Sequence, residues 1–294
     1  MIKLIASDMD GTLLNDHMDV SLSNAQAIKR AQSQGIHFVI ATGRDYPMAA
    51  HPLKAHDIEC PIIALNGAQL FDVDGHNLYN KGLEKSTVKK IRNILAQYPD
   101  LHEELMTNEG IYSNNQEKRL DTIASMLADL NPDISYEEAM QNAISHAEEN
   151  NVKFVESFDA LLEDDSIIIL KLSAHTEEGA SILKPLKEQL MNEVPKLAIT
   201  ASSKKNIEIN HESAQKGIAV AKYAKKLGIK ADEVMTIGDN INDLSMLEWA
   251  KYGTAVENAV SEAKESAHYS TSNNSQNGVA EAISRVLSGK IYKE

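Results

Sequence analysis

The chain has 294 residues, enough for two domains, and 24% of them are charged. Its 43 acidic and 29 basic residues give a net charge of −14 at pH 7. This charge disfavours a nucleic acid partner, because a basic surface is needed to neutralise phosphates. A hydrophobic content of 43% with only 14 Gly and 7 Pro excludes collagen-like and largely disordered chains.

The apolar runs are short. The longest, Ile167 to Leu170 and Phe38 to Ala41, fall far below the roughly 20 residues that cross a bilayer, so no membrane partner is expected. Asp8 interrupts the N-terminal segment too early for the apolar part of a signal peptide, which favours a cytoplasmic protein. The single cysteine, Cys60, excludes an internal disulfide and a thiolate metal cluster, and we interpret it as a small buried residue.

The first 83 residues alternate short apolar runs with a helical pattern, as parallel βαβ units do. The runs predict strands at Leu4 to Ser7, Phe38 to Ala41 and Ile62 to Leu65. Between the first two strands, the spacing predicts a helix that begins after Ser21 or Ser23 and ends at Gly35. Residues 68 to 80 hold two short alternating runs around Asp74-Gly75, which indicate a hairpin.

The middle of the chain is compositionally distinct. Residues 84 to 165 carry 18 acidic and 7 basic side chains, so they hold −11 of the net charge. A helical stretch around Val88, Ile91 and Leu95 begins this part. The patterns then predict helices at 116–130 and 135–149 and strands at 152–156, 167–174, 196–200 and 206–210. We therefore predict that residues 84–211 form an inserted α+β domain.

After residue 212 the alternation of strand and helix resumes. It predicts helices at Gln215 to Leu227, at Asn242 to Ala250 and up to Leu287, and strands at Val234 to Ile237 and Gly253 to Val256. We therefore predict an α/β fold, in which a Rossmann-like parallel sheet core made of residues 1–83 and 212–294 is interrupted by the insert.

Two aspartates directly follow the first strand, in the run Asp8-Met9-Asp10-Gly11-Thr12. Ligands of open parallel sheets bind at the carboxyl ends of the strands, and residues two apart on a strand start out on the same face. Crowded carboxylates repel one another, and a bound cation relieves that repulsion. The alternative, a simple turn with Asp8 as a helix cap, does not explain why both acids occupy this position.

Two further places fit an anion. Thr42-Gly43 follows the second strand, where a hydroxyl and neighbouring backbone N–H groups can approach a phosphate, although such a pair is often only a turn. Lys216-Gly217 begins a helical stretch, and a helix N-terminus already favours negative charge. Most lysines, however, are solvated surface charges.

A last acidic group, Gly238-Asp239-Asn240-Ile241-Asn242-Asp243, follows the strand Val234 to Ile237. Asp239 takes the same position at a strand end as Asp8, so we interpret it as a metal ligand. Asn242 and Asp243 fit helix N-capping, which is compatible with a role in the site.

Taken together, the runs DMDGTL, ATGR, LNGA (65–68), Lys216-Gly217 and GDNINDLSML resemble the motifs of the haloacid dehalogenase-like phosphatases, in the order that superfamily presents them. The position of the insert after the third strand resembles the Cof-type subfamily, which has an α/β cap. The resemblance covers the whole chain, although the cap matches only in size, position and type.

The resemblance implies a mechanism for each group. Asp8 would attack phosphorus to form an aspartyl-phosphate, and Asp10 would act as general acid and then as general base. Mg²⁺ would be held by Asp8, the Asp10 carbonyl and Asp239, with Asp243 orienting these ligands. The phosphate oxygens would be bound by Thr42, Gly43, Lys216, Asn242 and the backbone at Met9. Arg44 and Asn66 lie in the same motifs, where a role in the site and a structural role are equally open.

The expected partner is a small phosphorylated metabolite, with sugar phosphates as the first substrate class to test. A phosphomutase would use the same core motifs, and a phosphate-binding sensor would bind without turnover. A signalling receiver domain is disfavoured, because its phosphate acceptor follows the third strand, where this chain has Leu65-Asn66-Gly67 and no aspartate.

Overall fold

The computed structural model describes residues 1–98, 100–130, 134–149 and 152–290. A few positions of the predicted core and insert lie outside the described residues, namely 99, 131–133, 150–151 and 291–294. The chain forms two compact units, Met1–Tyr79 with Ser213–Glu294, and Asn80–Glu212. The first boundary comes slightly before the predicted residue 83, because Leu83 already forms a bridge with Ile169 of the second unit.

The first unit is built on one eight-stranded sheet with the order β14-β13-β12-β1-β2-β3-β4-β5. The strands from β14 to β3 are parallel and β4 is antiparallel to β3, while β4 and β5 are neighbours that flank the predicted hairpin turn at Asp74-Gly75. Their bounds are β1 Leu4–Ser7, β2 His37–Ala41, β3 Ile62–Ala64, β4 Gln69–Phe71, β5 Asn77–Asn80, β12 Val234–Gly238, β13 Tyr252–Val256 and β14 Tyr269–Thr271. The predicted α/β class with a parallel sheet is confirmed.

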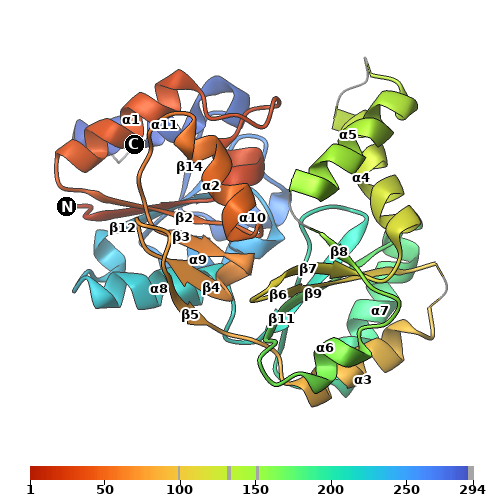
Figure 1. Cartoon of the computed structure of the whole chain (residues 1–294). Helices are drawn as coiled ribbons and strands as arrows, with labels where there is room; N and C mark the ends of the chain where they lie inside the picture. The colour runs from red at the N-terminus through yellow and green to blue at the C-terminus, as the bar shows by residue number, and fades with distance from the viewer. Residues whose placement is uncertain (99, 131–133, 150–151, 291–294) are drawn as a thin grey trace. The chain divides into compact units, whose positions relative to one another are not determined.

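Helices cover both faces of this sheet (Figure 1). They are α1 Leu22–Ser33, α2 Tyr46–Lys54, α8 Lys216–Lys226, α9 Leu244–Trp249, α10 Ser261–Ser266 and α11 Gly278–Leu287. Because side chains alternate along a strand, Ile5 packs into the core with α1 and α11, whereas Leu4 and Ala6 pack into the core with α8 and α9. Ser21 caps α1 by accepting a hydrogen bond from the Asn24 backbone at 3.1 Å.

The second unit is built on a six-stranded sheet with the order β10-β11-β9-β6-β7-β8, mostly antiparallel. Its strands are β6 His102–Thr107, β7 Gly110–Ser113, β8 Lys153–Phe154, β9 Ile169–His175, β10 Leu197–Thr200 and β11 Asn206–His211. Its helices are α3 Lys85–Leu95, α4 Gln116–Leu130, α5 Tyr136–Glu149, α6 Asp159–Glu163 and α7 Ala180–Glu193.

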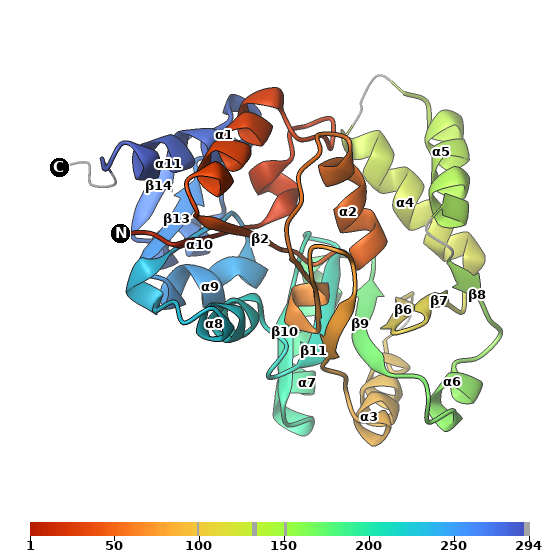
Figure 2. The same ribbon diagram turned by 60° about the vertical axis from the view of Figure 1, so that its left-hand side comes forward.

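Two layers of helix stabilise the second unit. One face of the sheet packs against α3, α6 and α7 through an apolar core that includes Leu105, Leu172 and Leu186. Helices α4 and α5 lie side by side (Figure 2) and share a small core around Ala124 and Ala143. Among the described residues, we find no helix that combines the length and apolarity needed to span a membrane.

Candidate active site

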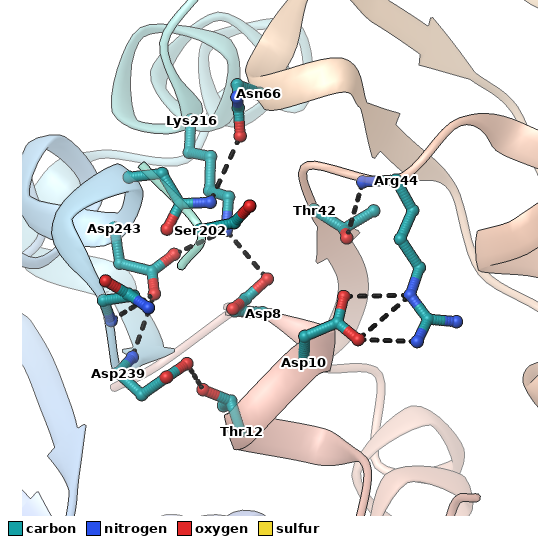
Figure 3. A network of polar contacts seen from close by, with 12 residues as sticks. Asp8, Asp10, Thr12, Thr42, Arg44, Asn66, Ser202, Lys216, Asp239 and Asp243 are labelled. Carbon is teal, nitrogen blue, oxygen red and sulfur yellow. Dashed lines mark hydrogen bonds and ion pairs between the residues drawn. The ribbon is translucent and has the colours of Figure 1, made fainter. Parts of the chain in front are cut away.

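Three adjacent parallel strands bring the predicted site residues together. Asp8 follows β1, Thr42 follows β2 and Asp239 follows β12, and β1 lies between the other two strands in the sheet. The carboxyl ends of these strands therefore meet at one edge, and Figure 3 shows their side chains around a common centre. The chain turns sharply at this edge, because Gly11 adopts a φ of 72°.

Lys216 lies fully buried at the start of α8. Its ammonium group donates hydrogen bonds to Oδ1 of Asp8 and to Oδ1 of Asp243, each at 2.7 Å. The glycine after it permits this position, since a Cβ at Gly217 would lie 2.1 Å from the Ser245 carbonyl oxygen. The Lys216-Gly217 pair thus combines a buried cation with the close approach of α8 to α9.

Asp243 and Thr12 order the loop that carries Asp239. One carboxylate oxygen of Asp243 accepts hydrogen bonds from the backbone N–H groups of Asp239 at 2.9 Å and Asn240 at 3.0 Å, and its other oxygen binds Lys216. The Thr12 hydroxyl donates to Oδ1 of Asp239 at 2.7 Å. Asp239 is therefore fixed from both the β1 loop and its own loop.

The centre of the site contains more acidic than basic side chains. Carboxylate oxygens of Asp8, Asp239 and Asp243 all lie within 4.8 Å of one another, and Lys216 contacts two of the three, Asp8 and Asp243. Burial, and then the neighbouring Asp243, raise the pKa of Asp8 well above its usual range and that of Asp239 to about 7. Burial opposes ionisation of Lys216, but Asp243 and Asp8 together raise its pKa above the ordinary value.

This donor set fits a hard divalent cation. Carboxylate oxygens are the ligands that Mg²⁺ and Ca²⁺ prefer, and the uncompensated negative charge is what a cation would relieve. The predicted metal residues Asp8, Asp239 and Asp243 thus form one cluster.

Asp10 points away from that cluster, toward Arg44 (Figure 3). The Arg44 guanidinium donates to both carboxylate oxygens, with Nε at 2.9 and 3.1 Å and Nη2 at 2.5 Å. Its Nη1 also donates to the Met48 carbonyl oxygen of α2 at 3.2 Å. The Asp10 side chain keeps 47% of its surface exposed, so it is held in direction yet remains open to a ligand.

The remaining predicted residues surround the same strand ends. Thr42 is buried, and its hydroxyl accepts a hydrogen bond from the Arg44 backbone at 3.1 Å, across the turn that contains Gly43. Asn242 donates to Oδ1 of Asn66 at 3.2 Å, while its own Oδ1 is buried without a hydrogen-bond partner among the residues that the structure describes. The Met9 side chain packs in the core, at the start of the turn after β1.

Sequence reasoning missed two supporting contacts. Thr12 was part of the first run without a role, yet it binds Asp239, and its fixed spacing from Asp8 was the available signal. Ser245 accepts a hydrogen bond from the Gly217 backbone at 3.0 Å, which no local pattern indicates. Arg44 and Asn66 both lie next to predicted site residues, since Arg44 contacts Asp10 and Asn66 contacts Asn242.

Comparison with known proteins gives a consistent result. A model of a family described as haloacid dehalogenase-like hydrolase matches residues 5–283. The sequence is 36% identical over 293 residues to a 5-amino-6-(5-phospho-D-ribitylamino)uracil phosphatase, YwtE, of Bacillus subtilis, with 98% of this chain and 99% of the relative covered. It is 31% identical over 290 residues to the phosphatase YwpJ of the same organism, covering 97% of this chain and 100% of the relative.

The fold is also similar to a solved structure. A haloacid dehalogenase-like hydrolase from B. subtilis superposes with a TM-score of 0.85 at 29% identity, covering 97% of this chain and 100% of the other. Both the sequence and the fold are therefore matched along nearly the whole chain.

Proposed function

The chain belongs to the haloacid dehalogenase-like hydrolases and is a phosphatase of that family, and on this premise we propose that it hydrolyses small phosphomonoesters through a phosphoaspartate at Asp8. The observation that carries the proposal is the buried contact of Lys216 with Asp8 and Asp243, next to Asp239. Phosphoryl transfer needs positioning and charge neutralisation, and this cluster supplies a nucleophile, a fixed cation and a metal site together.

The first half of the reaction is an attack by a carboxylate oxygen of Asp8 on phosphorus. The bond to the leaving oxygen breaks, and Asp10 gives that oxygen a proton, so an alcohol departs. In the second half, Asp10 takes a proton from water, and the resulting nucleophile attacks phosphorus. This step releases inorganic phosphate and restores both aspartates.

Mg²⁺ is the proposed metal, held by Asp8, the Asp10 carbonyl and Asp239. When bound, it neutralises charge on the phosphate oxygens and on the crowded carboxylates. Asp243 orients the site rather than binding the ion, because Lys216 and two backbone N–H groups already occupy its oxygens. Lys216 holds Asp8 in place and faces the phosphate with its positive charge.

The phosphate oxygens are bound, in this proposal, by Thr42, Gly43, Lys216, Asn242 and the Met9 backbone. Burial of Thr42 and Asn242 supports this role, since buried polar groups normally have partners and a phosphate would supply one. Arg44 holds the carboxylate of Asp10 ready for proton transfer.

The second unit acts, in this proposal, as a cap that selects the organic part of the substrate. A folded module of residues 80–212 disfavours protein or nucleic acid substrates on grounds of size. Sugar phosphates and related polyol phosphates are the proposed class, which agrees with the ribitylamino phosphate in the name of one relative. The proposed location is the cytoplasm.

The test is a panel of small phosphomonoesters incubated with purified protein and Mg²⁺ and scored for inorganic phosphate. Release of phosphate supports hydrolysis. An isomerised phosphosugar without release would instead identify a phosphomutase, and tight binding without turnover at any Mg²⁺ concentration would identify a phosphate sensor.

A further inference from the structure

Three asparagine side chains hold the turn that carries Asp10. The turn follows β1 and spans Met9–Leu13. Each asparagine donates its amide N–H to a backbone carbonyl oxygen at this turn: Asn258 to Gly11 at 2.7 Å, Asn24 to Leu13 at 3.0 Å and Asn274 to Leu14 at 2.8 Å. Backbone carbonyl groups need hydrogen-bond partners, and these partners come from the loop after β13, from α1 and from the turn after β14.

Asn258 uses both ends of its amide. While its Nδ2 donates to Gly11, its Oδ1 accepts a hydrogen bond from the backbone N–H of Asn274 at 3.0 Å. A carbonyl partner on one side and an N–H partner on the other determine which way the amide faces. The loop of Asn258 is itself fixed, because the Val260 backbone donates to the Asp239 carbonyl oxygen at 2.9 Å. Asn258 thus connects the turn after β1 with a loop that is already anchored at the candidate site.

Exposure separates Asn258 from the other two asparagines. Asn24 and Asn274 are buried, so their hydrogen bonds satisfy polar atoms that water does not reach. Asn258 is exposed, and the loss of an exposed polar side chain usually changes stability little. Folding stability therefore accounts for Asn24 and Asn274 but does not account for the contact of Asn258 with Gly11.

Gly11 is the most adaptable residue of this turn. Its φ is 72° and its ψ is 0°, and a Cβ there would lie 2.5 Å from Oδ2 of Asp239, so only glycine fits. The same lack of a side chain lets its backbone rotate freely unless its carbonyl is held. After Gly11, the Thr12 hydroxyl already binds Asp239. Before Gly11 lies Asp10, whose side chain is partly exposed, so the hydrogen bond from Asn258 matters most for Asp10.

We propose that Asn258 is a positioning residue, which directs the carboxyl group of Asp10 toward the leaving oxygen of the substrate by holding the Gly11 carbonyl. The Arg44 guanidinium orients the carboxylate itself, and Asn258 fixes the backbone from which that side chain extends. A general acid works only within hydrogen-bond reach of the oxygen that it protonates, and a misplacement of about 1 Å costs on the order of 100-fold in rate. The inference rests on the proposed function, in which Asp10 gives its proton to the leaving oxygen.

The experiment compares two aryl phosphates of similar shape, phenyl phosphate and p-nitrophenyl phosphate, with purified protein and Mg²⁺. Nitrophenolate is a weak base and departs without a proton, whereas phenolate is a stronger base and benefits from a general acid. The measured quantity is kcat/KM, because it covers the first half of the reaction, in which the leaving oxygen departs. Asn258→Ala is expected to lower kcat/KM at least about 10-fold for phenyl phosphate and less than about 3-fold for p-nitrophenyl phosphate. A general loss of structure would lower both values equally.

Two further variants separate the two ends of the amide. Asn258→Asp keeps the acceptor for the Asn274 backbone but loses the donor to Gly11, so it is expected to behave like Asn258→Ala. Asn273→Ala removes a comparable hydrogen bond within its own loop, to the Ser275 backbone at 2.9 Å. It is the matched control and is expected to leave both kcat/KM values unchanged. Thermal unfolding of each variant verifies that it is folded.

A double variant tests whether Asn258 acts through Asp10. Asp10→Asn removes the general acid, so it is expected to lower kcat/KM for phenyl phosphate more strongly than for p-nitrophenyl phosphate. If Asn258 serves only to position Asp10, it has nothing left to position in that background. Adding Asn258→Ala to Asp10→Asn is therefore expected to lower kcat/KM for phenyl phosphate by less than about a further 2-fold.

The outcomes are distinguishable. If Asn258→Ala keeps the wild-type kcat/KM for phenyl phosphate, water replaces the amide, and the inference is wrong while the phosphatase stands. If Asn258→Asp keeps it, the link to Asn274 is what matters, which also overturns the inference. An equal loss for both substrates, or a full further loss in the Asp10→Asn background, excludes action through Asp10. If the wild type releases phosphate neither from these aryl phosphates nor from any small phosphomonoester, the proposed function itself has failed.

Discussion

The two units each bury a cluster of charged side chains, and the clusters differ in charge balance. In the first unit, three buried carboxylates lie together, Lys216 contacts two of them, and the pKa of the third, Asp239, is raised to about 7. In the buried cluster of the second unit, Glu104 pairs with Arg119 and Glu208 pairs with Lys171. Although burial opposes it, the Arg119 guanidinium helps to hold the pKa of Glu104 below its ordinary value.

The difference indicates which of the two clusters is suited to a metal ion. An excess of negative charge is unfavourable until a cation arrives, so the first cluster is suited to a metal ion. A cluster in which each carboxylate is paired with its own cation has no such excess, so an added ion gains nothing there. Burial of charge alone therefore does not identify a metal site; the sum of the charges does.

Replacing the proposed nucleophile has the largest expected effect. Asp8→Asn removes a poised carboxylate but preserves its shape, so turnover of an aryl phosphate is expected to fall by several orders of magnitude. Phosphate release measures this, with circular dichroism to verify the fold. Residual activity above about 1% of wild type would contradict covalent catalysis at Asp8.

Metal dependence is the next largest effect. Chelator-treated protein is expected to lose activity and to recover it with Mg²⁺, and Asp239→Asn is expected to weaken Mg²⁺ binding at least 10-fold, since one charged ligand is lost. A Mg²⁺ titration followed by calorimetry measures the binding. Asp72→Asn, in an exposed acidic turn of the same unit, is the control that leaves binding unchanged.

Breaking a balanced pair tests the second cluster. Arg119→Met leaves Glu104 buried without its guanidinium, and is expected to reduce the free energy of unfolding by about 3–5 kcal/mol. The double variant Arg119→Met/Glu104→Leu is expected to recover most of this loss. Urea unfolding measures both, and Lys205→Met, which breaks an exposed pair with Glu177, serves as a control with a cost below about 1 kcal/mol.

The smallest expected effect is that the stabilities of the two units respond to pH in opposite directions. Asp239 has a raised pKa in the folded, metal-free protein, so the folded state binds more protons than the unfolded state between about pH 4 and 7, and acidification through this range stabilises the first unit. His102 has a lowered pKa of about 4, so the unfolded state binds more protons between about pH 4 and 6.5, and acidification destabilises the second unit.

Hydrogen exchange of the metal-free protein at pH 7 and pH 5 measures each unit separately, after correction for the intrinsic pH dependence of exchange. Protection from global opening is expected to rise in the first unit and fall in the second. Asp239→Asn should reduce the rise, leaving the part that comes from the raised pKa of Asp8, and the same direction of change in both units would contradict the comparison.

Much of the first unit could be predicted from the sequence because its signals are local. Buried parallel strands appear as continuous apolar runs, as at Phe38 to Ala41, and the residue after each run is the one that reaches the edge of the sheet. Asp8 and Asp239 were predicted as site residues because each directly follows a predicted strand. Their closeness in space depends on the pairing of β1 with β12, which no local pattern indicates.

The strand β6 could not be predicted in the same way. Its sequence, HEELMT, contains two acids and lacks an apolar alternation, yet Glu104 is fully buried. The partner that makes this burial possible, Arg119, lies on α4, and neither residue signals the other locally. For the same reason the pairing of His102 on β6 with His175 on β9 could not be predicted from the sequence.

The pairing of Leu4 with Val234 has a consequence for the order in which the protein forms on the ribosome. Strands β1 to β3 emerge early, but β1 lacks its neighbour β12 until nearly the whole chain has been made. Residues 80–212 are continuous and can fold in the meantime, because domains generally fold as units during synthesis. The candidate active site, which needs both β1 and the loop after β12, is thus completed only after residues 80–212 have been made, and a translation product that ends before Asp239 does not carry it.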